Sequence, residues 1–169
     1  MRLETERLLL RPLDVVDIDA LVALWTDPRV TAFLGGPRDP EELRRTFRED
    51  LRRQPPDPFD LWPVIEKPSG TLVGHSGLLE KEVEGRQEVD LVYVFVPSVW
   101  GNGYATEIGR ALMQYAFEEM GLKRLVCLVE PENAASGHVA RRLGMRYEGL
   151  VLRPGGRTLQ LYAASSSGA

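Results

Sequence analysis

The sequence is poor in the residues from which disulfides and metal sites are built. Its 169 residues include one cysteine, Cys127, and two histidines, His75 and His138. A single cysteine excludes an internal disulfide, and its place in the apolar run RLVCLVE predicts a buried, inert thiol. The clustering of ligands that is typical of a metal centre is absent, so we expect no metal site.

Long apolar runs and an excess of positive charge are lacking as well. No segment approaches the roughly 20 apolar residues that a membrane-spanning helix needs, and the N-terminus shows no signal-peptide pattern. The net charge of −4 argues against a nucleic-acid-binding surface. We therefore expect a soluble, cytoplasmic protein that binds neither membrane nor nucleic acid.

What the chain does contain is enough apolar sequence for one core. Hydrophobic residues make up 43% of the chain, so we assign residues 1–164 to a single domain and the polar residues 165–169 to a flexible tail. Capping signals and apolar spacing predict the order βαα-βββ-αβ-αββ, a mixed α/β chain. The predicted strands are 7–13, 59–67, 71–81, 89–96, 124–130, 145–152 and 157–163, and the predicted helices are 14–27, 39–54, 103–120 and one that follows PENAAS and ends at Gly144.

Small residues alternate just before the third predicted helix. Gly101, Gly103 and Ala105 follow the apolar run LVYVFV. The first N–H groups of a helix lack partners within it, and the helix dipole adds partial positive charge, so such a turn can bind a phosphate closely. The same pattern also fits a tight strand-to-helix turn without a ligand, and a single Gly-x-Gly does not decide between the two.

Two common phosphate-binding motifs are missing from this turn. No lysine follows Gly103, as a P-loop requires, and Thr106 stands where a dinucleotide-binding fingerprint has its third glycine. Phosphoryl transfer by a kinase-like protein is therefore disfavoured. What remains is a ligand that is bound through its phosphates without transferring them, and coenzyme A (CoA) fits that description.

Four segments together give a more specific signal than the glycines. They are ETERLLLRPLDVVDIDALVALWTDPRV, LVGHSGL, DLVYVFVPSVWGNGYATEIGRALMQYAFEEMGLKRL and VEPENAASGHVARRLGMRYEG. In this order the chain resembles the GCN5-related N-acetyltransferases (GNAT), in the branch of ribosomal-protein alanine N-acetyltransferases. The resemblance implies an α/β (mixed α+β) GNAT fold, with a central, mostly antiparallel sheet splayed at the acetyl-CoA site and helices on both faces. It also implies transfer of an acetyl group from acetyl-CoA to a primary amine.

The resemblance further implies which residues bind acetyl-CoA. The family's Q/R-x-x-G-x-G/A loop falls on Trp100, Gly101, Asn102, Gly103, Tyr104 and Ala105. Backbone amides of this loop would hold the pyrophosphate, and Thr106 would add a hydroxyl. Tryptophan in place of Gln/Arg is usual in this branch.

Four more positions match the part of the site that holds the pantetheine arm. Phe95 and Val96 would offer backbone groups to the arm and to the thioester carbonyl, where an N–H would stabilise the oxyanion. Asn133 and Ser136 match polar positions along the arm. Without the resemblance, these two residues also fit helix caps.

The candidates for proton transfer come from the same resemblance. Ser136 would contact the leaving sulfur and help to protonate the thiolate, because Ala140 stands where many relatives have a tyrosine. Asp90 would act as the base, with Glu88 two residues earlier on the same face of the strand; an ordinary solvated acid is the alternative. His75 matches a position where the family often has histidine, and we expect a structural role for it.

The acceptor amine is not encoded in a readable way. In this family it is selected by residues 27–58 and 150–158, and both a protein N-terminus and a small-molecule amine fit. Exposed strands near the C-terminus could pair into a homodimer. The alternative to an enzyme is a CoA-binding sensor or interaction module without turnover, for which the missing tyrosine leaves room. Thiol release from acetyl-CoA in the presence of amines separates these two functions.

Overall fold

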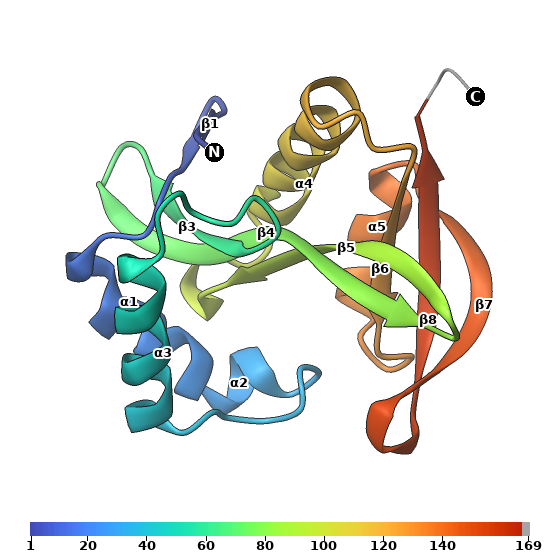
Figure 1. Ribbon diagram of the computed structural model, residues 1–169, viewed down its shortest axis with the longest axis horizontal. Helices are drawn as coiled ribbons and strands as arrows, with labels where there is room; N and C mark the ends of the chain where they lie inside the picture. Colours follow the sequence, from blue (N-terminus) through green and yellow to red (C-terminus); the bar gives the residue numbers. More distant parts are fainter. Residues whose placement is uncertain (167–169) are drawn as a thin grey trace.

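The computed structural model describes residues 1–166, and these build a continuous eight-stranded sheet (Figure 1). The strands follow one another across the sheet in the order β1-β2-β3-β4-β5-β6-β8-β7. All neighbouring strands are antiparallel except β5 and β6, which are parallel. The strands are β1 (Leu3–Glu4), β2 (Leu8–Leu10), β3 (Leu61–Glu66), β4 (Thr71–Val83), β5 (Arg86–Phe95), β6 (Arg124–Val129), β7 (Arg146–Arg153) and β8 (Arg157–Ser165).

The helices begin where the sequence carries capping residues. Asp14 and Asp17 form a capping box at the 3-10 turn that leads into α1, and Asp39 accepts a hydrogen bond from the amide of Glu42 at the start of α3. A π-helical turn, Tyr115–Glu119, continues α4. The helices are α1 (Ile18–Thr26), α2 (Pro28–Thr31), α3 (Pro40–Arg52), α4 (Tyr104–Gln114) and α5 (Ala134–Arg142).

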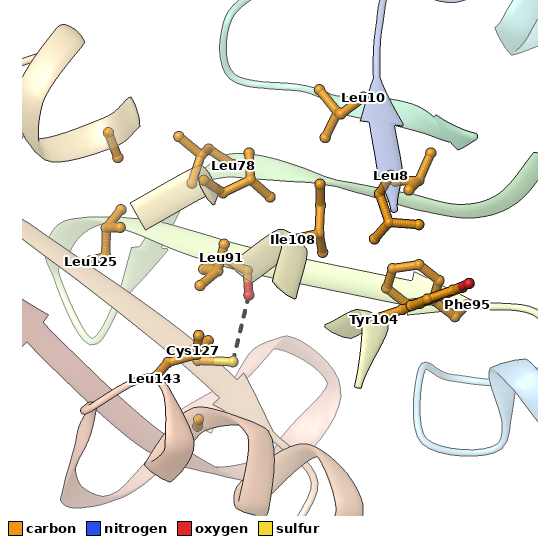
Figure 2. Packing of buried hydrophobic residues seen from close by; sticks show 14 of the residues in the cluster. Leu8, Leu10, Leu78, Leu91, Phe95, Tyr104, Ile108, Leu125, Cys127 and Leu143 are labelled. Carbon is orange, nitrogen blue, oxygen red and sulfur yellow. Dashed lines mark hydrogen bonds between the residues drawn. The ribbon is translucent and has the colours of Figure 1, made fainter. Parts of the chain in front are cut away.

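Helices cover both faces of the sheet, each over its own apolar cluster. α1 and α3 lie together on one side and α4 on the other (Figure 1). The larger cluster lies under α4 and α5, and Figure 2 shows Leu91, Ile108 and Leu125 packed in it near Cys127. The thiol of Cys127 is buried and donates to the carbonyl oxygen of Leu91 at 3.5 Å, as expected for an inert core cysteine.

The feature of the fold that positions the site is the separation of β5 from β6. The two parallel strands are in register at a single pair, Asp90 and Val126. β4 and β5, in contrast, pair along ten residues. β5 and β6 therefore diverge from Asp90 onward and leave a gap toward the end of β5, which is the splayed sheet that the resemblance implied.

The order of elements predicted from the sequence is confirmed, with differences at the edges. The short β1 and α2 were not predicted, and the first predicted strand, 7–13, is shorter than expected because only 8–10 pair in the sheet. Ser165 ends β8 and the amide of Ser166 donates to the carbonyl oxygen of Lys123, so these two residues extend the domain past the predicted boundary. The rest of the predicted tail, 167–169, lies outside the described residues.

Candidate functional site

The turn before α4 has the backbone geometry that an anion site requires. Gly101 and Gly103 have φ angles of +81° and +80°, a conformation that residues with a Cβ rarely adopt. Gly103 is the N-cap of α4 and has no side chain to bond the first amides of the helix. These amides are therefore directed toward the space in front of the helix, together with the positive end of its dipole.

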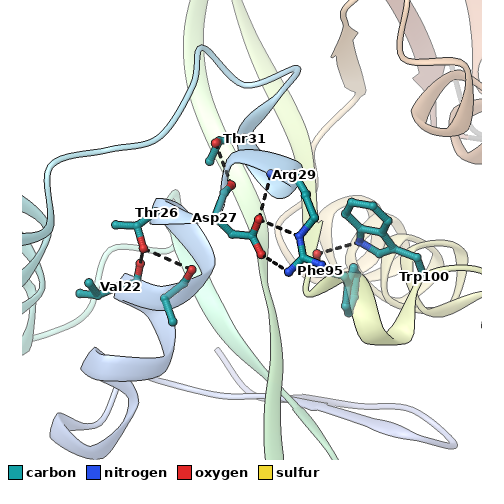
Figure 3. A network of polar contacts seen from close by, with 8 residues as sticks. Val22, Thr26, Asp27, Arg29, Thr31, Phe95 and Trp100 are labelled. Atoms are coloured by element: carbon teal, nitrogen blue, oxygen red, sulfur yellow. Dashed lines mark hydrogen bonds and ion pairs between the residues drawn. The ribbon is translucent and has the colours of Figure 1, made fainter.

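The side chains in this turn brace the loop and leave the space in front of it open. The indole N–H of Trp100 donates to the carbonyl oxygen of Phe95 at 2.8 Å, which ties the loop to the end of β5 (Figure 3). The hydroxyl of Tyr104 donates to Glu66 at 2.6 Å, and its ring is buried. Arg7 stacks on that ring at 4.5 Å and forms an ion pair with Glu107 at 2.7 Å. Tyr104 thus offers only its backbone to a ligand.

A cavity of about 230 Å³ lies between this turn and α5. Phe95 and Trp100 line one side of it, and His138, Val139 and Arg142 line the other. The sequence-predicted loop residues Gly101, Gly103, Tyr104, Ala105 and Thr106 also contribute to its walls. The cavity therefore combines helix-terminal amides with a cationic side chain, as an anion site does.

A second cavity, of about 270 Å³, occupies the gap between β5 and β6 and is called the central cavity below. It brings together the two candidates for proton transfer, Asp90 from β5 and Ser136 from α5. Its wall also includes residues from distant segments, among them Phe33, Leu34 and Arg38 before α3 and Arg157 at the start of β8. These segments lie within the two ranges that the resemblance linked to acceptor selection.

Asp90 lies at the point where β5 and β6 separate. Its carboxylate accepts hydrogen bonds from the ammonium of Lys81 at 2.5 Å and from the amide of Leu128 at 3.1 Å. The residue is only 3% exposed, and burial raises the pKa of its carboxyl above the ordinary value, although Lys81 opposes the rise. Asp90 is thus not an ordinary solvated acid, the alternative left open by the sequence.

Asn133 and Ser136 take different positions at the start of α5. Asn133 is the N-cap, and its side-chain oxygen accepts from the amide of Ser136 at 3.2 Å, so the capping role is confirmed for it. The hydroxyl of Ser136 lies 3.2 Å from the hydroxyl of Tyr93. Ala140, one turn later, is fully buried and contributes no polar group.

The N–H of Val96 does not point into the gap between β5 and β6. The Val96 amide donates to the carbonyl oxygen of Val73 on the β4 side, and its carbonyl accepts from the amide of Val99. Successive residues of a strand direct their backbone groups to opposite sides. Because Val96 directs its groups toward β4, Phe95 directs its own to the other side. Its carbonyl accepts from Trp100 there, and its N–H points toward the gap.

Glu88 and His75 lie apart from Asp90 and Ser136. Glu88 accepts from Arg124 at 3.1 Å and lines a different cavity. His75 is buried against Trp25, whose indole N–H donates to its Nδ1 at 3.0 Å, and burial lowers the pKa of the imidazole to about 4. Its neutral, hydrogen-bonded ring supports the structural role expected from the sequence.

Two of the side chains in the central cavity were missed by reasoning from the sequence. Tyr93 sits in the apolar run LVYVFV, where it reads as a core residue, and Lys81 is the last residue of a predicted strand. The pairing of Lys81 with Asp90 follows from the β4–β5 register and had no signal of its own.

Residues 1–166 contain neither a cluster of metal ligands nor a helix suited to a membrane. No three His, Cys, Asp or Glu side chains gather in that range in a way that could hold a metal ion. None of the helices in that part of the chain has the length and apolar character to cross a membrane.

Comparison with known proteins places this geometry in a family. The family model described as an acetyltransferase (GNAT) domain matches residues 7–146. The N-acetyltransferase YnaD of Bacillus subtilis, itself uncharacterized, is 30% identical over 149 residues, which cover 88% of this chain and 85% of that protein. A GNAT-family acetyltransferase from Bacillus anthracis superposes with a TM-score of 0.82 at 28% identity, over 98% of both chains.

A more distant solved structure shares the fold. RimL, a ribosomal-protein acetyltransferase solved in complex with CoA, superposes with a TM-score of 0.77 at 18% identity over 100% of both chains. The family match over most of the chain, together with the splayed sheet and the turn before α4, identifies the protein as an acetyltransferase of the GNAT family.

Proposed function

We propose that the protein transfers the acetyl group of acetyl-CoA to a primary amine, either a protein N-terminus or a small-molecule amine, by direct attack of the neutral amine on the thioester. The observation that carries this proposal is the gap between β5 and β6. Phe95 and Ala135 line the cavity at the turn before α4, and their neighbours Val94 and Ser136 line the central one. The turn before α4 and the pair of polar side chains thus line two cavities that adjacent residues of β5 and α5 border.

The residues around the turn fit the diphosphate of CoA. Gly101 and Gly103 hold the conformation that brings the backbone close to an anion, and a Cβ at either position would be strained. Arg142, across the cavity, adds positive charge. CoA supplies the thioester, and the N–H of Phe95 would donate to its carbonyl oxygen, the position where negative charge develops.

Asp90 is the proposed base for the attacking amine. Because burial raises the pKa of its carboxyl, Asp90 accepts a proton more readily than an ordinary aspartate does. A water in the cavity would relay the proton. A protein α-amine, with a pKa of about 7.7–8.0, needs little help from such a base near neutral pH, whereas a lysine at about 10.4 needs more.

The alternative function, a CoA-binding sensor without turnover, is favoured by one observation. Asp90 is already paired with Lys81, and Ser136 with Tyr93. Groups held this way could serve the structure of the gap alone.

A homodimer also stays a prediction: β7 is an edge strand with Leu150 and Leu152 exposed, and sedimentation velocity would test it.

The test is thiol release from acetyl-CoA with a panel of amines that includes peptides with free and blocked N-termini, polyamines and arylamines. Calorimetry with CoA is run in parallel on the same protein. CoA binding together with release that depends on one class of amine supports the enzyme and names its acceptor. Saturable binding without release on any amine favours the sensor. Absence of CoA binding at millimolar concentration rejects both.

A further inference from the structure

One polar side chain in the central cavity has no role in the chemistry proposed so far. Tyr93 belongs to β5, and its hydroxyl reaches α5 across the gap. It lies 3.0 Å from the carbonyl oxygen of Ser136, 3.2 Å from the Oγ of the same residue and 3.4 Å from the Sγ of Cys127. These contacts link the two sides of the gap at the serine.

We propose that Tyr93 is a positioning residue that holds the Ser136 hydroxyl as a hydrogen-bond donor to the departing sulfur of CoA. The proposal rests on the proposed function, because it requires the thioester to lie in the gap beside Ser136. One turn after the serine, α5 supplies no hydrogen-bonding side chain, since Ala140 occupies that position and is fully buried. The group that supports Ser136 therefore comes from a different element, β5.

The positions of the protons allow this role without movement of heavy atoms. A tyrosine hydroxyl has one proton and can also accept. Tyr93 can donate to the Ser136 carbonyl while the serine donates to Tyr93, or it can donate to Oγ, which leaves the serine proton free for another acceptor. Rotation about the two C–O bonds converts the first arrangement into the second. In the second, each hydrogen bond strengthens the next, so Ser136 becomes a better donor.

The surroundings of Tyr93 keep it protonated. Burial raises the pKa of its phenol well above the ordinary range, and the nearby carboxylate of Asp90 acts in the same direction. Burial also raises the pKa of the Cys127 thiol to about 12, so this neighbour stays uncharged as well. Lys81 is paired with Asp90 at 2.5 Å. Tyr93 therefore serves as a permanent donor and loses no proton in the reaction.

The transfer step balances in atoms and electrons. The bond between the amine nitrogen and the acetyl carbon forms, and the bond between that carbon and sulfur breaks. The sulfur leaves as a thiolate that accepts a hydrogen bond from Ser136. The nitrogen gives up one proton through Asp90 and solvent, and the thiolate takes up one proton from solvent. No oxidant or reductant is needed.

Three variants test this coupling in acetyl transfer: Tyr93→Phe, Ser136→Ala and the double variant. We expect Tyr93→Phe to lower kcat about tenfold and to change KM for acetyl-CoA by less than about twofold, because the lost hydrogen bond acts on the departing charge. The double variant should be no slower than Ser136→Ala, since Tyr93 acts through the serine. An unchanged kcat in Tyr93→Phe, or a double variant whose loss is the product of the two single losses, overturns the proposal.

A second measurement needs no acceptor and no turnover. The thiol of bound CoA is titrated through the ultraviolet absorbance of its thiolate, below about pH 9.5, where ordinary tyrosines stay mostly protonated. The thiol should titrate about one pH unit higher in Tyr93→Phe than in the wild type. The matched control is Tyr147→Phe, which removes a hydroxyl from a half-exposed tyrosine on β7 and should leave the titration unchanged.

The two proposals fail in different ways. If the wild type does not bind CoA, the proposed function fails and no titration is seen. If every variant binds CoA and the thiol titrates at one pH in wild type, Tyr93→Phe and Ser136→Ala alike, only the role of Tyr93 is rejected. Thermal unfolding of each variant shows whether a lower kcat comes from a damaged fold.

Discussion

The two halves of the candidate site are built in opposite ways. The turn before α4 is one continuous segment, 100–106, whose functional groups are backbone amides set by two glycines. The central cavity is assembled from side chains that β4, β5, α5 and β8 contribute, with Lys81 and Arg157 more than 70 residues apart in sequence. A backbone site depends on conformation, and a side-chain site depends on register, so different substitutions should damage them.

The largest effect is expected from Asp90→Asn in the central cavity. The amide cannot accept the proton of the amine, so kcat should fall by at least about 100-fold, the lower range for loss of a general base. The affinity for CoA should stay within about threefold, because the turn before α4 does not involve Asp90. Steady-state kinetics and calorimetry measure the two quantities.

Glu88→Gln is the matched control for Asp90→Asn. Glu88 is also a buried acid on β5 and pairs with Arg124, whose side chain is 32% exposed, much as Lys81 is 30% exposed. Both changes should cost less stability than the roughly 3 kcal/mol of a fully buried pair, since each cation keeps some solvent. Equal losses of kcat in the two variants would show that Asp90 only supports the fold.

This contrast also explains how far the sequence could be interpreted. The turn was predictable because its signal is local: small residues at fixed spacing before a helix define the backbone. The pairing of Asp90 with Lys81 depends on how β4 lies against β5, and the contact of Tyr93 with Ser136 depends on the width of the gap. Neither contact can be predicted from a short segment of the sequence. The direction of the Val96 N–H is of the same kind, because it follows from strand pairing.

The next effect is expected from His75, which is buried beside Trp25, a residue in the wall of the central cavity. Its pKa in the folded protein, about 4, is below the ordinary value of 6.5, so the unfolded chain takes up a proton first as the pH falls. Stability should therefore decrease by about 2–3 kcal/mol between pH 7 and pH 4.5. Urea unfolding at the two pH values measures this loss.

His75→Asn is the comparison that isolates this effect. The asparagine oxygen can take the place of Nδ1 as acceptor for the indole N–H of Trp25, and it does not titrate. The variant should lose less stability than the wild type over the same pH interval, while all other groups titrate alike in both. Parallel losses in the two proteins would mean that His75 is not the group responsible.

A similar change in free energy, here in the binding of CoA at the turn before α4, is expected from Gly103→Val. The φ of +80° strains a β-branched residue, and the backbone should leave the conformation that directs its amides at the ligand. Loss of two hydrogen bonds to a charged group, each worth about 1.5 kcal/mol, would weaken CoA binding on the order of 100-fold. The added Cβ itself would meet only the Arg7 guanidinium, at 3.6 Å.

Gly85→Val separates strain from binding. Gly85 has a φ of +79° at the β4–β5 hairpin, where a Cβ would point into open space, and the whole of β5 separates it from the turn. Both variants should lose similar stability in urea, and only Gly103→Val should lose affinity for CoA. Unchanged CoA affinity in Gly103→Val would make the segment a plain turn and remove the basis of the proposed function.

The smallest effect on CoA binding is expected from Trp100, whose side chain lies in the turn before α4, where backbone amides form the site. Trp100 is 52% exposed, and its indole N–H bonds the carbonyl oxygen of Phe95 at 2.8 Å, so it fixes the loop and is not needed to supply the amides. Trp100→Ala should weaken CoA binding only about two- to fivefold, in line with one neutral hydrogen bond of about 0.5–1 kcal/mol. Trp100→Phe, which keeps an aromatic ring and removes the N–H, should match it if the hydrogen bond is the cause. A loss of CoA affinity as large as that of Gly103→Val would show that the loop binds its ligand through a side chain. The distinction between the turn before α4 and the central cavity would then no longer hold.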